Sequence, residues 1–114
     1  MFKKKVLVIG PMLADISLNI KLPHALNSII AHSNISISPG GKGYNIAHTL
    51  NLLNVPAILS TMYGKDDIGK FFARHLKNKN IEAPASNIVD GNSGIFVAVL
   101  NLILAYFKSN NFQK

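Results

Sequence analysis

The sequence predicts an α/β fold in which a parallel sheet carries a second, smaller sheet. Continuous apolar and β-branched runs alternate along the chain with segments whose apolar residues recur at helical spacing. Two further stretches alternate strictly between apolar and polar residues, the pattern of strands with one face in water. The expected order is strand, two amphipathic strands, helix, strand, helix and strand, with no internal repeat.

The first strand is expected at residues 5–9, where an apolar, β-branched run ends at a Gly-Pro pair. Such a run is typical of a strand covered on both faces. The amphipathic strands are expected at residues 16–22 and 34–38, and a further strand, rich in β-branched and aromatic residues, from Gly94 onward. The alternating pair does not fit a parallel core, so we expect it to form a small separate sheet.

The first helix is expected from Tyr44 to Asn54, before Pro56. Its apolar face would consist of Ile46, Ala47, Leu50 and Leu53. A buried strand is expected at residues 57–62, and the second helix begins with Asp66 or Asp67 as its cap. A short strand at residues 87–89 completes the alternation. Crossovers between such strands are right-handed and give a parallel sheet.

The composition limits the classes of function. With 114 residues, 48% of them hydrophobic and 15% charged, the chain is one folded domain or less. The absence of cysteine excludes disulfides and thiolate metal sites and is compatible with a cytoplasmic location. The net charge of +7 is dispersed, so we interpret it as a solvated surface, and no nucleic-acid motif accompanies it. No apolar stretch is long enough to span a membrane.

A glycine cluster, Gly40-Gly41-Lys42-Gly43, stands directly before the first expected helix. Glycines allow positive φ and the close approach of another molecule. The start of a helix offers free N–H groups that suit anions and hydroxyl groups. The spacing matches neither a Walker A loop nor a dinucleotide fingerprint. From the residues alone, a ligand-binding turn and a purely structural turn both remain open.

Two polar residues are candidates for binding a ligand near this turn. Asp15 follows the first strand, and ligands of α/β sheets gather at the carboxyl ends of strands. Its carboxylate could accept hydrogen bonds from two sugar hydroxyls, or it could serve a turn or cap. Asn45, in the first helical turn, could face a ligand or bond locally. The four histidines show no metal-ligand spacing, and we expect no metal site.

The stretch from Gly40 to Ala47 reads Gly-Gly-x-Gly-x-Asn-x-Ala, and Gly64 to Gly69 reads Gly-x-Asp-x-x-Gly. Together these motifs resemble the PfkB carbohydrate kinase family, over about residues 5–100. The resemblance implies the N-terminal part of a Rossmann-like ribokinase fold with a small β-sheet lid, whose strands would lie at about residues 16–22, 34–38 and 95–101. It also implies a kinase that transfers phosphate from ATP, with Mg²⁺, to a sugar hydroxyl.

The resemblance further implies which residues hold the substrate: Asp15, Gly40, Gly41, Lys42 and Asn45. The Gly-Gly pair would act as a hinge when the lid closes. Lid strands of many family members pair between subunits, which implies a possible homodimer.

Two positions depart from ribokinases. Leu13 stands where ribokinases usually have Asn, and Phe96 lies in the segment where, by the resemblance, a strand would reach the sugar pocket. A kinase for pseudouridine, another nucleoside or fructose 1-phosphate is therefore an alternative to a ribose kinase. The ring of Phe96 would either change the substrate or fill the core.

The length is the largest departure, because family kinases are well over twice as long. The Gly-Ala-Gly-Asp motif that carries their catalytic Asp, and the nucleotide site, have no counterpart in residues 1–114. We therefore expect a truncated, inactive chain with no catalytic residue, in which the ATP and Mg²⁺ region is missing. The alternative from another class is a non-catalytic module for sugar binding or dimerisation.

Overall fold

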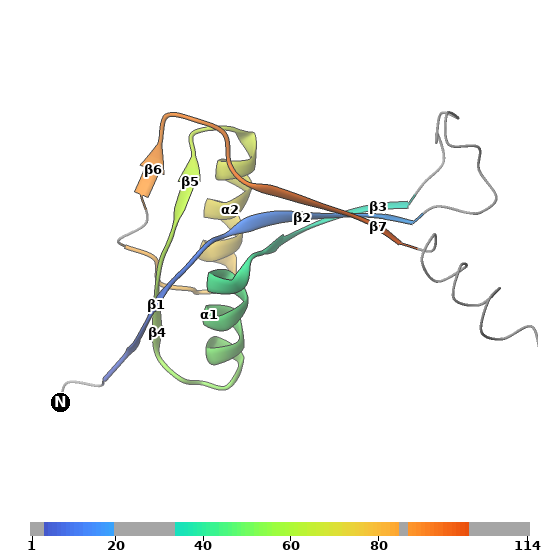
Figure 1. Cartoon of the computed structure of the whole chain (residues 1–114). Coiled ribbons are helices and arrows are strands. Elements are labelled where there is room, and N and C mark those ends of the chain that lie inside the picture. Colours follow the sequence, from blue (N-terminus) through green and yellow to red (C-terminus); the bar gives the residue numbers. More distant parts are fainter. Residues whose placement is uncertain (1–3, 20–33, 85–86, 101–114) are drawn as a thin grey trace, which may run out of the picture.

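The computed structural model describes residues 4–19, 34–84 and 87–100 (Figure 1). Its order of elements confirms the predicted one. The elements are β1 (Val6–Ile9), β2 (Leu13–Asn19), β3 (Asn34–Gly40), α1 (Lys42–Leu52), β4 (Ala57–Ser60), β5 (Met62–Gly64), α2 (Asp67–Asn78), β6 (Asn87–Val89) and β7 (Ile95–Leu100). The expected lid residues 20–22 and 101 lie outside the described residues.

The parallel part of the fold forms around β4 and β5, which follow one another along the chain. β1 pairs in parallel with β4, and β5 pairs in parallel with β6. A single parallel bridge between Ile58 and Glu82 adds the segment after α2 to this arrangement. The strand expected at residues 57–62 is therefore divided, and Thr61 lies at the break between β4 and β5.

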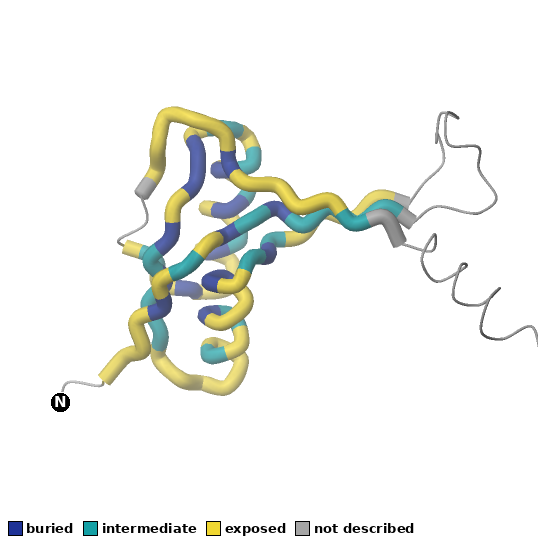
Figure 2. The backbone as a smooth tube through the Cα atoms, viewed as in Figure 1, coloured by how far each residue is buried: buried dark blue, intermediate teal, exposed yellow. Residues whose placement is uncertain are grey.

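Both helices pack against the same side of these strands (Figure 1). The buried residues gather between strands and helices, as the dark segments in Figure 2 show. They are Val8, Met12, Ala14, Tyr44, Ala47, Leu59, Tyr63, Phe72, Leu76 and Ile81. In β1 only Val8 is buried, whereas Leu7 is 59% and Ile9 is 77% exposed. The expectation that β1 is covered on both faces is wrong for the described residues, because they supply helices to one face only.

The first helix starts and ends two residues earlier than the expected range of 44–54. Ala47 and Leu50 pack against the core, but Ile46 and Leu53 are exposed. The expected apolar face is thus rotated, because the contact with β1 and β4 runs along the face that carries buried Gly43, Tyr44 and Ala47. Among the described residues no helix is both long enough and apolar enough to cross a bilayer.

The small sheet has the order β3-β2-β7 and extends away from the core (Figure 1). β2 pairs antiparallel with β3 and parallel with β7. This confirms the separate sheet expected from the alternating segments, which we call the lid sheet. β2 begins at Leu13 rather than at residue 16, so Asp15 lies within a strand instead of a turn.

Candidate functional site

Asp15 lies in the central strand of the lid sheet, close to the core. Its partners in register are Ser38 of β3 and Phe96 of β7. Directly paired residues in a sheet point to the same face, so the three side chains share one face. The pairing therefore brings together a carboxylate, a hydroxyl and an aromatic ring from segments far apart in the sequence.

The Asp15 carboxylate lies directly against Gly40, the last residue of β3. A Cβ built on Gly40 would overlap the carboxyl group of Asp15, with Oδ1 at 2.8 Å and the other atoms closer. Gly40 is buried, so no free space can absorb a side chain there. Any residue larger than glycine would therefore displace the carboxylate, which is the movable end of the Asp15 side chain.

Gly41 makes the turn between β3 and α1. Its φ of 90° lies in the left-handed region that residues with a Cβ avoid. The turn is tied to the end of β1, because the N–H groups of Gly43 and Tyr44 donate to the Pro11 carbonyl at 3.0 and 3.3 Å. Two of the first N–H groups of α1 are thereby occupied, so the helix start offers fewer free donors than the sequence suggests.

Lys42 and Asn45 both lie in the first turn of α1, and both are exposed. The backbone of Asn45 is used locally, since its N–H donates to Gly41 and its carbonyl accepts from Thr49 Oγ1 at 2.8 Å. Its side-chain amide stands at the surface of the same turn. The structure thus places Gly40, Gly41, Lys42 and Asn45 in one turn, and the pairing of β2 with β3 adds Asp15.

The Gly-x-Asp-x-x-Gly motif, from Gly64 to Gly69, holds the start of β7 in place. Asp66 caps α2 by accepting from the Gly69 N–H at 2.8 Å, and it accepts from the backbone N–H and Oγ of Ser93 at 2.7 and 2.6 Å. Ser93 Oγ in turn accepts from the Gly64 N–H at 3.0 Å. Hydrogen bonds from Ser93, and then from Gly69, hold the pKa of Asp66 below its ordinary value.

The partner of Asp66 could not be found from the sequence, because 27 positions separate it from Ser93. Ser93 directly precedes Gly94 and the lid strand β7. The only sequence signal for it is a serine beside a glycine at the start of an apolar strand. The motif Gly-x-Asp-x-x-Gly therefore joins the core to one strand of the lid sheet.

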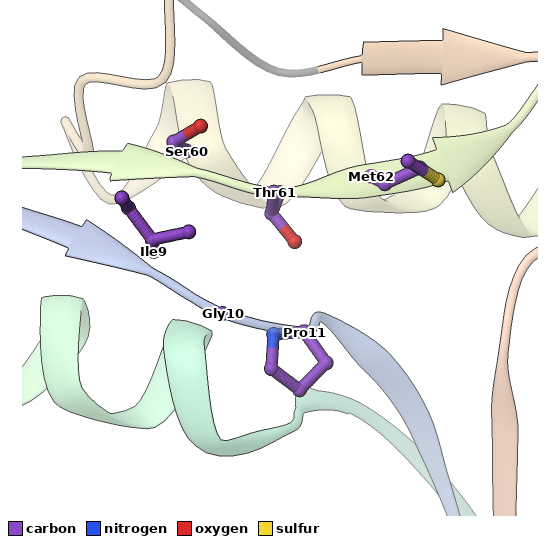
Figure 3. Close-up of a pocket in the computed structure, with 6 residues that line it drawn as sticks. All are labelled: Ile9, Gly10, Pro11, Ser60, Thr61 and Met62. Atoms are coloured by element: carbon purple, nitrogen blue, oxygen red, sulfur yellow. The ribbon is translucent and has the colours of Figure 1, made fainter.

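A hollow of about 300 Å³ lies where β1 and β4 end (Figure 3). Its lining residues are Ile9, Gly10, Pro11, Ser60, Thr61 and Met62. The sequence reasoning missed Thr61, which is buried at the break between β4 and β5. The hollow adjoins the candidate substrate residues through Pro11, whose carbonyl binds the first turn of α1.

Among the residues that the structure describes, no three His, Asp or Glu side chains come together in a way that could hold a metal ion. His75 of α2 lies edge-on to Phe71, with ring centroids 4.4 Å apart. The described side chains therefore do not form a ligand set for Mg²⁺.

Three solved structures illustrate what the fold is similar to. Ribokinase from Giardia lamblia superimposes with a TM-score of 0.73 at 24% identity, over 86% of this chain and 32% of that one. Arabidopsis thaliana ribokinase complexed with ribose and ATP superimposes with a TM-score of 0.71 at 27% identity, over 84% of this chain and 32% of that one. The nucleoside kinase of Methanocaldococcus jannaschii superimposes with a TM-score of 0.71 at 20% identity, over 85% of this chain and 33% of that one. The chain spans about a third of the length of the solved structures it matches.

No curated protein matches the sequence. The family model described as pfkB family carbohydrate kinase matches residues 3–109, which is nearly the whole chain. That match agrees with the ribokinase-type fold, with its lid sheet and with the glycine turn beside Asp15. The chain belongs to the pfkB family of carbohydrate kinases.

Proposed function

We propose that this chain forms the acceptor-substrate side of an ATP-dependent PfkB kinase, which transfers phosphate to a hydroxyl group of a sugar or nucleoside. The position of the Asp15 carboxylate against Gly40 carries the proposal. It supports a role in which a carboxylate is held at the base of a lid, next to a flexible turn and a helix start. Carboxylate oxygens can accept hydrogen bonds from two neighbouring hydroxyls of a sugar.

The other candidate residues have distinct tasks in this proposal. Asn45 donates to and accepts from a substrate hydroxyl with its exposed amide. Lys42 contributes a positive charge to the same turn. Gly41, at the junction of β3 and α1, lets the lid sheet move toward the core, because a glycine with positive φ changes conformation at low cost. Closing the lid would exclude water from the reacting hydroxyl.

ATP and Mg²⁺ supply the phosphoryl group and the charge neutralisation in this chemistry. The described residues offer no ligand set for the metal, and the Gly-Ala-Gly-Asp motif does not occur in residues 1–114. We therefore propose that these 114 residues bind the acceptor but do not transfer phosphate on their own.

Phe96 favours a nucleoside as the acceptor. Its ring is 57% exposed and shares a face with Asp15, so within the described residues it does not fill the core. Exposed aromatic rings can stack on nucleobases. Leu13 stands where ribokinases usually have Asn, and its side chain lies against Gly94. The polar contact of that Asn is absent, which favours an acceptor other than ribose.

The opposite face of the lid sheet supports a homodimer. This face is apolar: it carries Ile16 with its register partners Ile37 and Val97, and also Ile35 and Ile95. At least half of the surface of Ile35, Ile37, Ile95 and Val97 is exposed in the described part of the chain. A second copy laid against this face would remove that surface from water.

Calorimetric titration of the purified chain with ribose, fructose, uridine and pseudouridine tests the proposal. We expect binding of at least one compound and its loss in Asp15→Asn, because the amide replaces an acceptor oxygen by a donor. Asp90→Asn, at an exposed position after β6, is the matched control. Binding that survives Asp15→Asn unchanged would contradict the proposed site, and ATP-dependent turnover by the chain would contradict its inactivity.

A further inference from the structure

The paired strands β1 and β4 separate at their carboxyl ends. Their register ends with Ile9 opposite Ser60, and a last hydrogen bond joins the Gly10 N–H to the Ser60 carbonyl at 3.2 Å. Pro11 follows and has no N–H to continue the ladder. The chain then leaves the core for the lid sheet, while β5 continues past Thr61. The hollow described above opens where the two strands part (Figure 3).

Thr61 presents an unsatisfied hydroxyl at this point. The residue is 6% exposed, and within the described residues its Oγ1 has no hydrogen-bond partner. Figure 3 shows the hydroxyl directed from the β4–β5 break toward Gly10 and Pro11. Buried hydroxyls in folded proteins almost always have a partner, because leaving one unpaired is unfavourable. A partner from outside the described chain would remove this penalty.

The lining of the hollow restricts the chemistry of that partner. Its side chains are apolar or carry a hydroxyl, and none is charged. An ionised phosphate or carboxylate would have no counter-charge there, so burying it would be costly. A neutral hydroxyl group can exchange a hydrogen bond with Thr61 while carbon atoms of the ligand contact Ile9 and Met62.

We propose that Thr61 is a specificity-determining residue, whose Oγ1 hydrogen-bonds a neutral hydroxyl of the acceptor substrate in this hollow. The inference rests on the proposed function, because it treats the hollow as the deep part of the same substrate site. The Pro11 carbonyl links the two parts, since it accepts from the N–H groups that open α1 beside Gly41. Thr61 then hydrogen-bonds one substrate hydroxyl, while Asp15 accepts hydrogen bonds from others.

The experiment uses the purified chain, Thr61→Val, which keeps the shape but lacks the hydroxyl, and Thr61→Ser, which keeps the hydroxyl. Each is titrated with D-ribose and with its 2-deoxy, 3-deoxy and 5-deoxy analogues. We expect Thr61→Val to bind ribose about tenfold more weakly and Thr61→Ser to bind it within about threefold of the unchanged chain. One deoxy analogue should bind the unchanged chain and Thr61→Val equally, because it lacks the hydroxyl that Thr61 contacts.

A second measurement does not depend on ligand. In urea unfolding without sugar, Thr61→Val should have a higher midpoint than the unchanged chain, because it removes an unpaired buried hydroxyl. A lower midpoint would overturn the inference, since it would mean that the hydroxyl already has a structural partner.

The binding data separate the inference from the proposed function. Ribose binding that is lost in Asp15→Asn but unchanged in Thr61→Val would overturn the inference alone. Binding that is lost in Thr61→Val but unchanged in Asp15→Asn would overturn the proposed site alone. If the unchanged chain binds none of ribose, its analogues, fructose, uridine and pseudouridine, both the role of Thr61 and the proposed acceptor site are wrong.

Discussion

The carboxylate of Asp15 occupies the space that a side chain at Gly40 would need. The two residues belong to paired strands of the lid sheet, and Gly40 immediately precedes the turn into α1. The absence of a side chain at one position thus sets the location of a charged group from another strand. This contact links the glycine motif to the acid that we propose as a substrate ligand.

Gly40→Ala should displace the Asp15 carboxylate. We expect weaker substrate binding with little change in the free energy of unfolding, because the atoms in the way are the far end of a side chain that can move aside. Gly91→Ala is the matched control, because a Cβ built on Gly91 meets no atom within 4 Å. Urea unfolding and calorimetric titration of both variants measure the two effects. Equal substrate binding by the two variants would contradict the predicted displacement.

Ser93→Ala should loosen the start of β7. The buried Gly64 N–H loses its acceptor, and Asp66 loses one of its three donors. We expect the free energy of unfolding to fall by about 1–2 kcal/mol, since an unpaired buried donor is costly. Ser36→Ala, at an exposed position of β3, is the control. Hydrogen exchange should be faster in β7 of Ser93→Ala, and unchanged protection there would speak against the anchor.

The lowered pKa of Asp66 predicts a dependence of stability on pH. Hydrogen bonds from Ser93, then from Gly69, favour the ionised form in the folded chain, so its pKa lies below the ordinary 3.8. The stabilisation is complete above about pH 4, near the unfolded pKa, and is lost as the pH falls through the folded pKa. Asp66→Asn should therefore be less stable than the unchanged chain at pH 7. The difference in the free energy of unfolding between the two should become smaller below pH 4. If urea titrations give a constant difference in the free energy of unfolding from pH 7 to pH 3, this linkage is excluded.

Phe96→Ala should discriminate between the two substrate classes. If the ring stacks on a nucleobase, the change weakens nucleoside binding by about 1–3 kcal/mol and affects free sugars little. Val97→Ala, the next residue but on the other face of the lid sheet, is the control. Titration with pseudouridine and ribose measures the difference. A loss that is equal for both ligands would argue against stacking on the base.

Ile37→Lys should abolish self-association through the apolar face of the lid sheet. The charged side chain would lie among exposed apolar residues of three strands, where a second copy is expected to bind. Ser36→Lys places the same charge on the opposite face and should leave association unchanged. Analytical ultracentrifugation measures both variants. A monomeric unchanged chain at high concentration would rule out the lid-mediated dimer.

The period of the apolar pattern was the most reliable guide to the fold. Strict alternation identified the lid strands β2 and β3, because a strand with one wet face needs that pattern. The glycine cluster and the following helical period located the turn into α1. The boundaries were less accurate, since β2 starts earlier than its alternating residues and thereby takes in Asp15.

Burial was harder to predict than secondary structure. The apolar run of β1 indicated cover on both faces, yet only Val8 is buried, because the described helices lie on one side. The contact face of α1 was rotated for a related reason. Which residues of a helix are buried depends on the strands it meets, and a 3.6-residue period leaves that choice open when apolar residues surround much of the helix.

By itself, the sequence determined the order of strands and helices, the family and the glycine turn, because these follow from local periodicity and from motifs of neighbouring residues. Only the tertiary structure decided that Asp15 rests against Gly40, that Ser93 binds Asp66, and that the Thr61 hydroxyl faces Gly10 and Pro11 with no partner among the described residues. These relationships join residues from different strands. They depend on register and on which strands part, and such non-local geometry leaves no pattern within any single stretch of chain.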